Sequence, residues 1–198
     1  MKVELRADGV VHISGYVNVT GRESRPVMTK HGKIPEVIEP GSFQRAIDAN
    51  EVGISVLLDH DASRRLAGTA DHTLTLYEDN IGLRAETEIT DPEVIEAAKN
   101  KKIRGWSFNM KNIVDEVEER ADKLPLRHVK SFDMDEISLV IKKIPVYSAT
   151  SVEIRADEEA DVEERSMMET VDVTLPKEPE NHKTVNEKFK ERLQAIKR

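Results

Sequence analysis

The sequence contains no cysteine among its 198 residues. This absence excludes disulfide bonds, zinc sites built from thiolates and cysteine nucleophiles. It also fits a reducing compartment such as the cytosol. The hydrophobic content of 38% is modest, but a chain of this length is expected to form one domain of ordinary size around a single core.

Other absences narrow the possible functions further. No apolar run approaches the ~20 residues that span a bilayer, and the opening MKVELRADG lacks the apolar stretch of a secretory signal. The formal net charge of -8 and the aromatic content of 4% argue against a nucleic-acid-binding protein. We therefore expect a soluble, intracellular protein with neither a membrane nor a nucleic acid as its partner.

The charge of the chain changes sign near its C-terminus. Residues 156–182 are strongly acidic and contain LPKEPEN, whose prolines disfavour both helices and sheet ladders, whereas residues 183–198 are basic. The basic segment has an apolar stripe at helical spacing after a possible capping box. We expect a folded domain over residues 1–155, an acidic disordered linker over 156–182 and a basic amphipathic helix over 183–198.

Most of the folded part has the alternating pattern of β-strands. Many short strands with few helices predict a mainly β (α+β) fold, a closed or nearly closed antiparallel barrel with a few short helices around it. Two helices are expected, one beginning at Ser42 as its N-cap and one at Asp91 followed by Pro92. The predicted strands are VVHISGYVNV (10–19), a hairpin in TLTLYEDNIGLRAETEI (73–89), IRGWSFNM (103–110), LRHVKSFDM (126–134) and EISLVIKKI (136–144).

The stretch GISVLLDHD begins as a buried strand and ends on an imidazole between two carboxylates. If the strand continues through His60, this side chain lies on the apolar face, while Asp59 points to the opposite face. Asp61 would lie on the same side as Asp59. The two carboxylates are therefore expected to lie away from the imidazole, with Arg64 and Arg65 as their partners. An acid that holds His60 has to come from another strand.

Two further strands carry polar side chains among apolar ones. Ser107 shares its face with Gly105, which leaves room for a ligand or another backbone. Glu136 and Ser138 share a face of a largely apolar strand, where a buried carboxylate needs a partner. A hydroxyl, an imidazole and a carboxylate are what nucleophilic acyl transfer requires. The residue types alone do not distinguish such a triad from unrelated buried polar groups, and Ser138 is a second possible nucleophile.

A metal site is the other chemistry that this stretch suggests. Asp59, His60 and Asp61, with His72, carry suitable ligand atoms. Adjacent strand residues point in opposite directions, so the three consecutive side chains cannot readily bind one ion. We expect no metal and no cofactor.

The order of several segments resembles the prohead (capsid maturation) proteases of tailed bacteriophages, a family related in fold to the herpesvirus assembly proteases. The resemblance covers nearly all of the expected folded domain. It is carried by IEPGSFQRAI (38–47), VLLDHD (56–61) with LAGTA (66–70), DNIGLRAETEI (79–89), IRGWSFNM (103–110), DEISLV (135–140) and IPVYSATSVEIR (144–155).

The resemblance implies roles for individual residues. The histidine of the HD segment and the serine of the G-x-S-F segment are the family's catalytic pair, which correspond to His60 and Ser107. Glu136 stands where the viral relatives place the third member of the triad. By analogy with the herpesvirus relatives, Lys142 and Lys143 are candidates for the oxyanion hole. The resemblance also implies a β-barrel surrounded by helices.

The implied function is that of a serine endopeptidase acting inside the immature prohead, in the cytoplasm of the bacterial host. Such an enzyme cleaves the scaffolding portion of the major capsid protein and itself, and the viral relatives form homodimers. An alternative is a non-catalytic assembly or scaffolding module that has retained the fold. An esterase is a further alternative, although the sequence has no nucleophile-elbow G-x-S-x-G motif.

Overall fold

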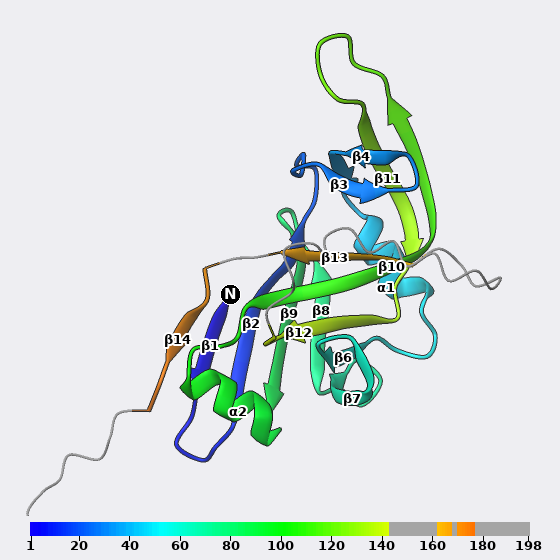
Figure 1. The fold of residues 1–198 in the computed structure, drawn as a ribbon. Helices are drawn as coiled ribbons and strands as arrows, with labels where there is room; N and C mark the ends of the chain where they lie inside the picture. Colours follow the sequence, from blue (N-terminus) through cyan, green and yellow to red (C-terminus); the bar gives the residue numbers. More distant parts are fainter. Residues whose placement is uncertain (143–161, 168–169, 177–198) are drawn as a thin grey trace, which may run out of the picture.

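Strands dominate the computed structural model, which describes residues 1–142, 162–167 and 170–176 (Figure 1). Only two helices occur among these residues, α1 (Ser42–Ala49) and α2 (Pro92–Lys99). The mainly β character expected from the sequence is confirmed. The strands are β1 (Lys2–Leu5), β2 (Val11–Val19), β3 (Val27–Thr29), β4 (Gly32–Ile34), β5 (Glu36–Ile38), β6 (Ser55–Leu58), β7 (Asp61–Gly68), β8 (Leu74–Glu78), β9 (Gly82–Ile89), β10 (Gly105–Glu118), β11 (Leu126–Asp133), β12 (Glu136–Val140), β13 (Glu163–Met167) and β14 (Asp172–Thr174).

The described strands form two larger sheets and a small hairpin of β3 and β4. The five-stranded sheet has the order β14-β1-β2-β9-β8, and the seven-stranded sheet has the order β5-β11-β10-β12-β6-β7, with β13 also paired to β10. Both larger sheets are open, so the predicted closed antiparallel barrel is wrong. Three pairings, β1 with β14, β5 with β11 and β6 with β12, are also parallel rather than antiparallel.

One hydrophobic core lies between the two larger sheets, where β2 packs against β10. Alternation along β2 places Val11, Ile13 and Val17 in this core, as the sequence pattern predicts. Phe43 of α1 forms edge-to-face contacts with Phe108 of β10 and Phe132 of β11, with ring centroids 5.2 and 5.3 Å apart. This aromatic cluster fixes α1 against the strand that carries Ser107.

The two helices begin in different ways. Asp91 caps α2 as predicted, since its side chain accepts hydrogen bonds from two backbone N–H groups of the first turn, and Pro92 follows it. Ser42 is not the cap of α1, because Gly41 holds that position in a left-handed conformation. The carboxylate of Glu78, on β8, accepts hydrogen bonds from the N–H groups of Gly41 and Gln44 instead.

The range 156–182 contains two strands that belong to the folded unit. β13 pairs with β10, and β14 pairs with β1 near the N-terminus (Figure 1). The expectation of a disordered linker is therefore wrong for these two stretches. The predicted helix over 183–198 lies outside the described residues. Among the described helices, none is long and apolar enough to cross a membrane.

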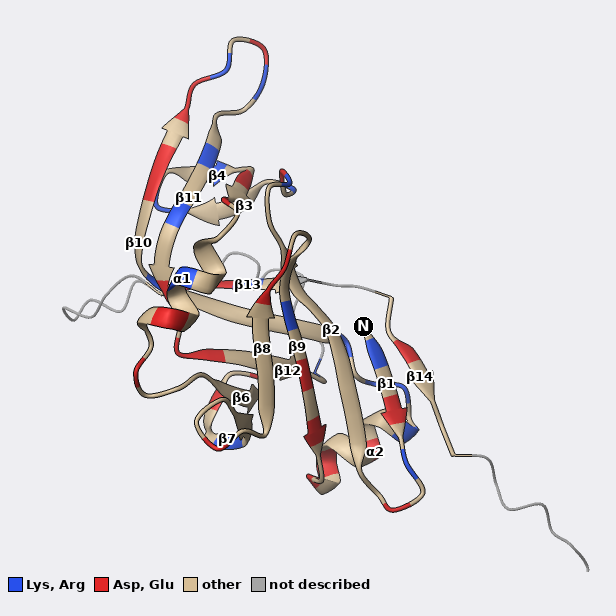
Figure 2. Ribbon diagram, turned by 180° about the vertical axis from the view of Figure 1, so that it is seen from behind, with Lys and Arg blue, Asp and Glu red and all other residues tan. Residues whose placement is uncertain are grey.

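The far half of β10 and its partner β11 extend from the body as a long hairpin (Figure 1). Along this hairpin, acidic residues lie on β10 and basic residues lie on β11 (Figure 2). Two cross-strand ion pairs follow from that arrangement, Asp115 with Arg127 at 2.6 Å and Glu116 with Lys130. Both pairs are diagonal, since Asp115 lies opposite Val129 and Glu116 opposite His128, and long side chains of opposite charge still reach each other at this offset.

Candidate active site

His60 lies in a two-residue turn rather than in a strand. β6 ends at Leu58, and β7 begins at Asp61, which pairs directly with Leu58. The two residues between them, Asp59 and His60, have φ angles of 49° and 61°. A short hairpin turn needs positive φ at both central positions, and aspartate and histidine tolerate that region better than most residues. The prediction that the strand runs through His60 is wrong, because the turn interrupts the alternation.

Asp59 anchors this turn to the end of β12. Its Oδ1 atom accepts hydrogen bonds from the backbone N–H groups of Ile141, at 2.9 Å, and Lys142, at 3.2 Å. The N–H of Lys142, a candidate oxyanion donor, is therefore bonded to a carboxylate in this structure. Lys143 lies outside the described residues.

The expected pairing of the aspartates with neighbouring arginines is also wrong. Arg64 bonds to Asp91 and Glu93 around the start of α2, and Arg65 pairs with Asp71 at 2.8 Å. Asp61 accepts hydrogen bonds from Ser63. Both arginines therefore bind carboxylates from other segments.

The structure brings His60 and Glu136 together. The Nδ1 atom of His60 lies 2.8 Å from Oε1 of Glu136, and the two side chains are 21% and 8% exposed. Ser138 completes the contact, since its hydroxyl donates to Oε2 of Glu136 at 2.6 Å and accepts a hydrogen bond from the backbone N–H of His60 at 3.1 Å. Glu136 and Ser138 together hold both the ring and the backbone of His60.

The surroundings of His60 favour its charged form. Burial is the largest effect and lowers the pKa of the imidazole, but the hydrogen bond and the charge of Glu136 and the charges of Glu164 and Asp59 together outweigh it. The pKa of His60 is therefore raised above its usual value. A carboxylate that accepts a hydrogen bond from Nδ1 leaves Nε2 as the atom that can take up a proton.

Ser107 lies on β10 between two serines on the neighbouring strands. Ser138 of β12 is its partner on one side and Ser166 of β13 on the other. Its hydroxyl is buried, donates to the backbone carbonyl of Arg165 at 2.8 Å and accepts a hydrogen bond from Ser166 at 2.9 Å. No hydrogen bond joins Ser107 to His60 in the part of the chain that the structure describes.

The contacts of β13 with Ser107 have no counterpart in the sequence predictions. Arg165 and Ser166 stand in an acidic run whose composition is typical of a solvated linker. Nothing in the local pattern indicates that this run pairs with a strand almost 60 residues earlier. Asp59 was misplaced for a different reason, because alternation fails at a turn.

Among the described residues, no group of three or more histidines and carboxylates could hold a metal ion.

The groups gathered here are those of acyl transfer. A hydroxyl is a weak nucleophile until a base removes its proton, and an imidazole held by a carboxylate is such a base. His60 and Glu136 are an imidazole and a carboxylate in hydrogen-bond contact, and Ser107 lies on the strand next to the one that carries Glu136. The hydroxyl also contacts a backbone carbonyl, which is the group that a peptidase attacks.

Comparisons with known proteins point in the same direction. No curated protein and no solved structure matches the chain. Residues 1–165 match the model of a protein family described as Caudovirus prohead serine protease. The matched range contains all three proposed triad residues and reaches into β13. The chain therefore belongs to the caudovirus prohead serine protease family, and it is a serine endopeptidase of phage capsid maturation.

Proposed function

We propose that this protease cleaves the scaffolding portion of the major capsid protein, and itself, with Ser107 as nucleophile, His60 as general base and Glu136 as the residue that orients His60. The observation that carries the proposal is the 2.8 Å contact between His60 Nδ1 and Glu136 Oε1. Family membership supports a capsid protein as the substrate and the interior of the prohead as the place of action.

In this mechanism, the Oγ atom of Ser107 attacks the scissile carbonyl carbon while Nε2 of His60 takes its proton. The imidazolium then gives that proton to the leaving amine, and water hydrolyses the acyl-enzyme by the same route. Glu136 stabilises the cation through Nδ1. The hydroxyl of Ser107 has a single proton, which now goes to Arg165, so it must rotate toward His60 for the attack.

Co-expression with the cognate capsid protein tests this proposal. Ser107→Ala should leave the capsid protein at full length, because removal of a triad member costs at least about 10³-fold in rate. Ser63→Ala is the matched control, since its exposed hydroxyl donates a hydrogen bond to Asp61. Capsid processing by Ser107→Ala at the wild-type rate would exclude Ser107 as the nucleophile, and with it the proposed mechanism.

The oligomeric state is a separate part of the proposal. The resemblance to the herpesvirus proteases implies a homodimer, which sedimentation of the purified full chain would detect. A monomer at working concentration would remove dimerisation from the proposal and leave the chemistry of Ser107 unaffected.

A further inference from the structure

β13 occupies an edge of β10 directly beside Ser107. Residues 106–108 of β10 pair with β12 on one edge and with β13 on the other. β13 therefore lies along the edge of β10 that a bound peptide strand would use (Figure 1). Ser107 is opposite Ser166, and its hydroxyl bonds to the carbonyl of Arg165. The peptide bond between Arg165 and Ser166 therefore lies at the nucleophile.

Side chains alternate along a strand, so the side chain of Arg165 points to the face of β13 opposite to that of Ser166. There it meets a side chain of opposite charge. Its Nε and Nη2 atoms lie 2.5 and 3.0 Å from the two carboxylate oxygens of Glu36, on β5. The arginine side chain is 12% exposed and that of Glu36 only 5%. A two-point contact of this kind fits the planar guanidinium and cannot be reproduced in full by lysine.

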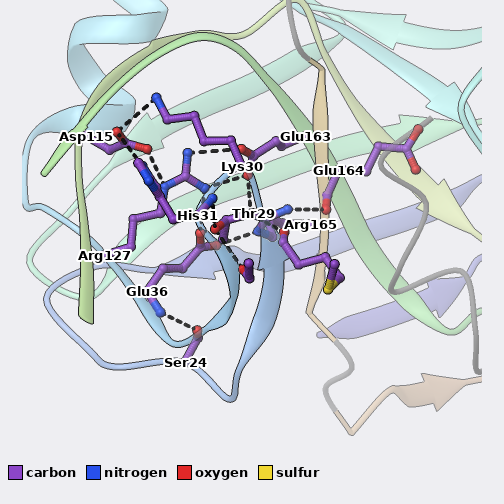
Figure 3. Close-up of polar contacts among 12 residues, drawn as sticks. Ser24, Thr29, Lys30, His31, Glu36, Asp115, Arg127, Glu163, Glu164 and Arg165 are labelled. Atoms are coloured by element: carbon purple, nitrogen blue, oxygen red, sulfur yellow. Dashed lines mark hydrogen bonds and ion pairs between the residues drawn. The ribbon is translucent and has the colours of Figure 1, made fainter. Parts of the chain in front are cut away.

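A second charged residue of β13 is held in the same way. Glu163, two positions before Arg165, binds Nη1 and Nη2 of Arg127 at 2.5 and 3.0 Å (Figure 3). Arg127 comes from β11, is fully buried and also binds Asp115. Alternate side chains of β13 thus meet fixed partners of opposite charge.

Burial makes these contacts selective. A peptide with a neutral or acidic residue in place of Arg165 would leave the carboxylate of Glu36 with only its 3.3 Å contact to Arg127 among the residues that the structure describes. A buried charge that loses its partner is strongly unfavourable, whereas an exposed ion pair contributes little. The site therefore discriminates among substrates through the residue before the scissile bond.

We propose that β13 is bound as a substrate strand and that the enzyme cleaves the bond between Arg165 and Ser166. Glu36 then selects arginine as the residue before the scissile bond. This inference rests on the proposed function. The preferred peptide carries an acidic residue two positions before that arginine, held by Arg127. Capsid-protein sites are expected to share the arginine.

The reaction is hydrolysis and needs only water as co-reactant. Oγ of Ser107 bonds to the carbonyl carbon of Arg165, and the C–N bond to Ser166 breaks as His60 protonates the nitrogen. Water then cleaves the ester, which leaves a carboxylate on Arg165, a new N-terminal amine on Ser166 and the hydroxyl of Ser107 restored.

The first experiment follows the purified full chain by intact mass spectrometry. The expected products end at Arg165 and begin at Ser166. Ser107→Ala should give neither product, and Arg165→Gln should slow this cleavage by about 100-fold or more. Cleavage that depends on Ser107 at another bond, with Arg165–Ser166 intact, would overturn the assignment of β13 and leave the proposed function standing.

The second experiment leaves the enzyme unchanged and varies the substrate. The peptide DVEERSMMET (residues 161–170) is compared with versions that carry lysine or citrulline instead of arginine. Citrulline keeps the shape of arginine without its charge, so kcat/KM should fall in the order arginine, lysine, citrulline. Equal values for the three peptides would overturn the selection of arginine, as would no cleavage of any of them by a preparation that processes capsid protein.

Glu36→Gln tests the partner residue. It should remove most of the preference for arginine over citrulline, with a thermal unfolding scan to confirm folding. Glu23→Gln is the matched control, because Glu23 forms a similar two-point contact with Arg120 at an exposed position away from β13. An unchanged preference in Glu36→Gln would exclude Glu36. A preparation that cleaves neither peptide nor capsid protein would overturn the proposed function as well.

Discussion

Replacement of Glu136 by glutamine isolates the charge behind His60. The amide has nearly the shape of the carboxylate, so the variant is expected to fold. In the proposed mechanism, however, it no longer stabilises the imidazolium that forms as Ser107 loses its proton. The contact is 2.8 Å long, and the glutamate side chain is only 8% exposed, so solvent cannot replace the lost charge. A comparable change in a serine protease triad lowers kcat by about 10⁴-fold, or about 5.4 kcal/mol at 1.36 kcal/mol per tenfold change.

Two measurements on the Glu136→Gln variant check the reasoning. Hydrolysis of the peptide DVEERSMMET should be slower by about 10³- to 10⁴-fold. An NMR titration of His60 should show a lower pKa, because burial still lowers the pKa of the imidazole while the hydrogen bond and charge of Glu136 no longer raise it.

Glu39→Gln is the matched control for this experiment. Glu39 lies 2.6 Å from Nδ1 of His128 and raises the pKa of that histidine, but the pair is not part of the site. The control should lower the pKa of His128 and leave hydrolysis unchanged. Wild-type activity in Glu136→Gln, with the pKa of His60 lowered as expected, would refute the orienting and stabilising role of Glu136.

Four further predictions follow from contacts described above. Glu136, Glu164 and Asp59 together outweigh burial and raise the pKa of His60, so a pH–rate profile should show kcat/KM rising with pH along a limb above pH 6.5. The Glu164→Gln variant should shift this limb to lower pH, because it removes one of the charges that raise the pKa of His60. The stability that the charged imidazole contributes is present below pH 6.5 and lost as pH rises through the raised pKa, which denaturant titrations at several pH values would detect. Asp59→Ala should cost about 1–2 kcal/mol in the free energy of unfolding and lower activity, since the turn loses two hydrogen bonds. Phe43→Ala should cost about 3–5 kcal/mol in the same measurement, because it empties the aromatic cluster.

Local patterns in the sequence predicted the elements that depend on neighbouring residues. The hairpin over 73–89 and the cap at Asp91 are both present, because turn and cap chemistry acts over a few residues. Closure of a sheet into a barrel could not be predicted in this way, because it depends on whether edge strands from distant parts of the chain pair with each other. Alternation of side chains is the same in an open sheet and in a barrel, so the pattern could not distinguish them.

The neighbourhood of His60 shows where strand alternation misleads. Alternation correctly indicated that an acid from another strand holds His60, and Glu136 supplies it. The same reasoning gave Asp59 a neighbouring arginine as its partner, although its carboxylate accepts a hydrogen bond from the backbone N–H of Ile141 at the end of β12. A turn with two positive φ angles places both residues by hydrogen bonding rather than by strand geometry.

The acidic run beyond residue 156 shows why composition alone cannot separate a linker from a bound strand. A segment rich in carboxylates stays solvated unless partners elsewhere compensate its charge. Here Arg127 on β11 binds Glu163 and Glu36 on β5 binds Arg165, so two charges that favour solvent in the isolated segment favour burial in the folded chain. Arg127 and Glu36 belong to β11 and β5 and are present whether or not a strand is bound beside β10. A substrate strand must therefore carry the same charges as β13, an acidic residue two positions before an arginine.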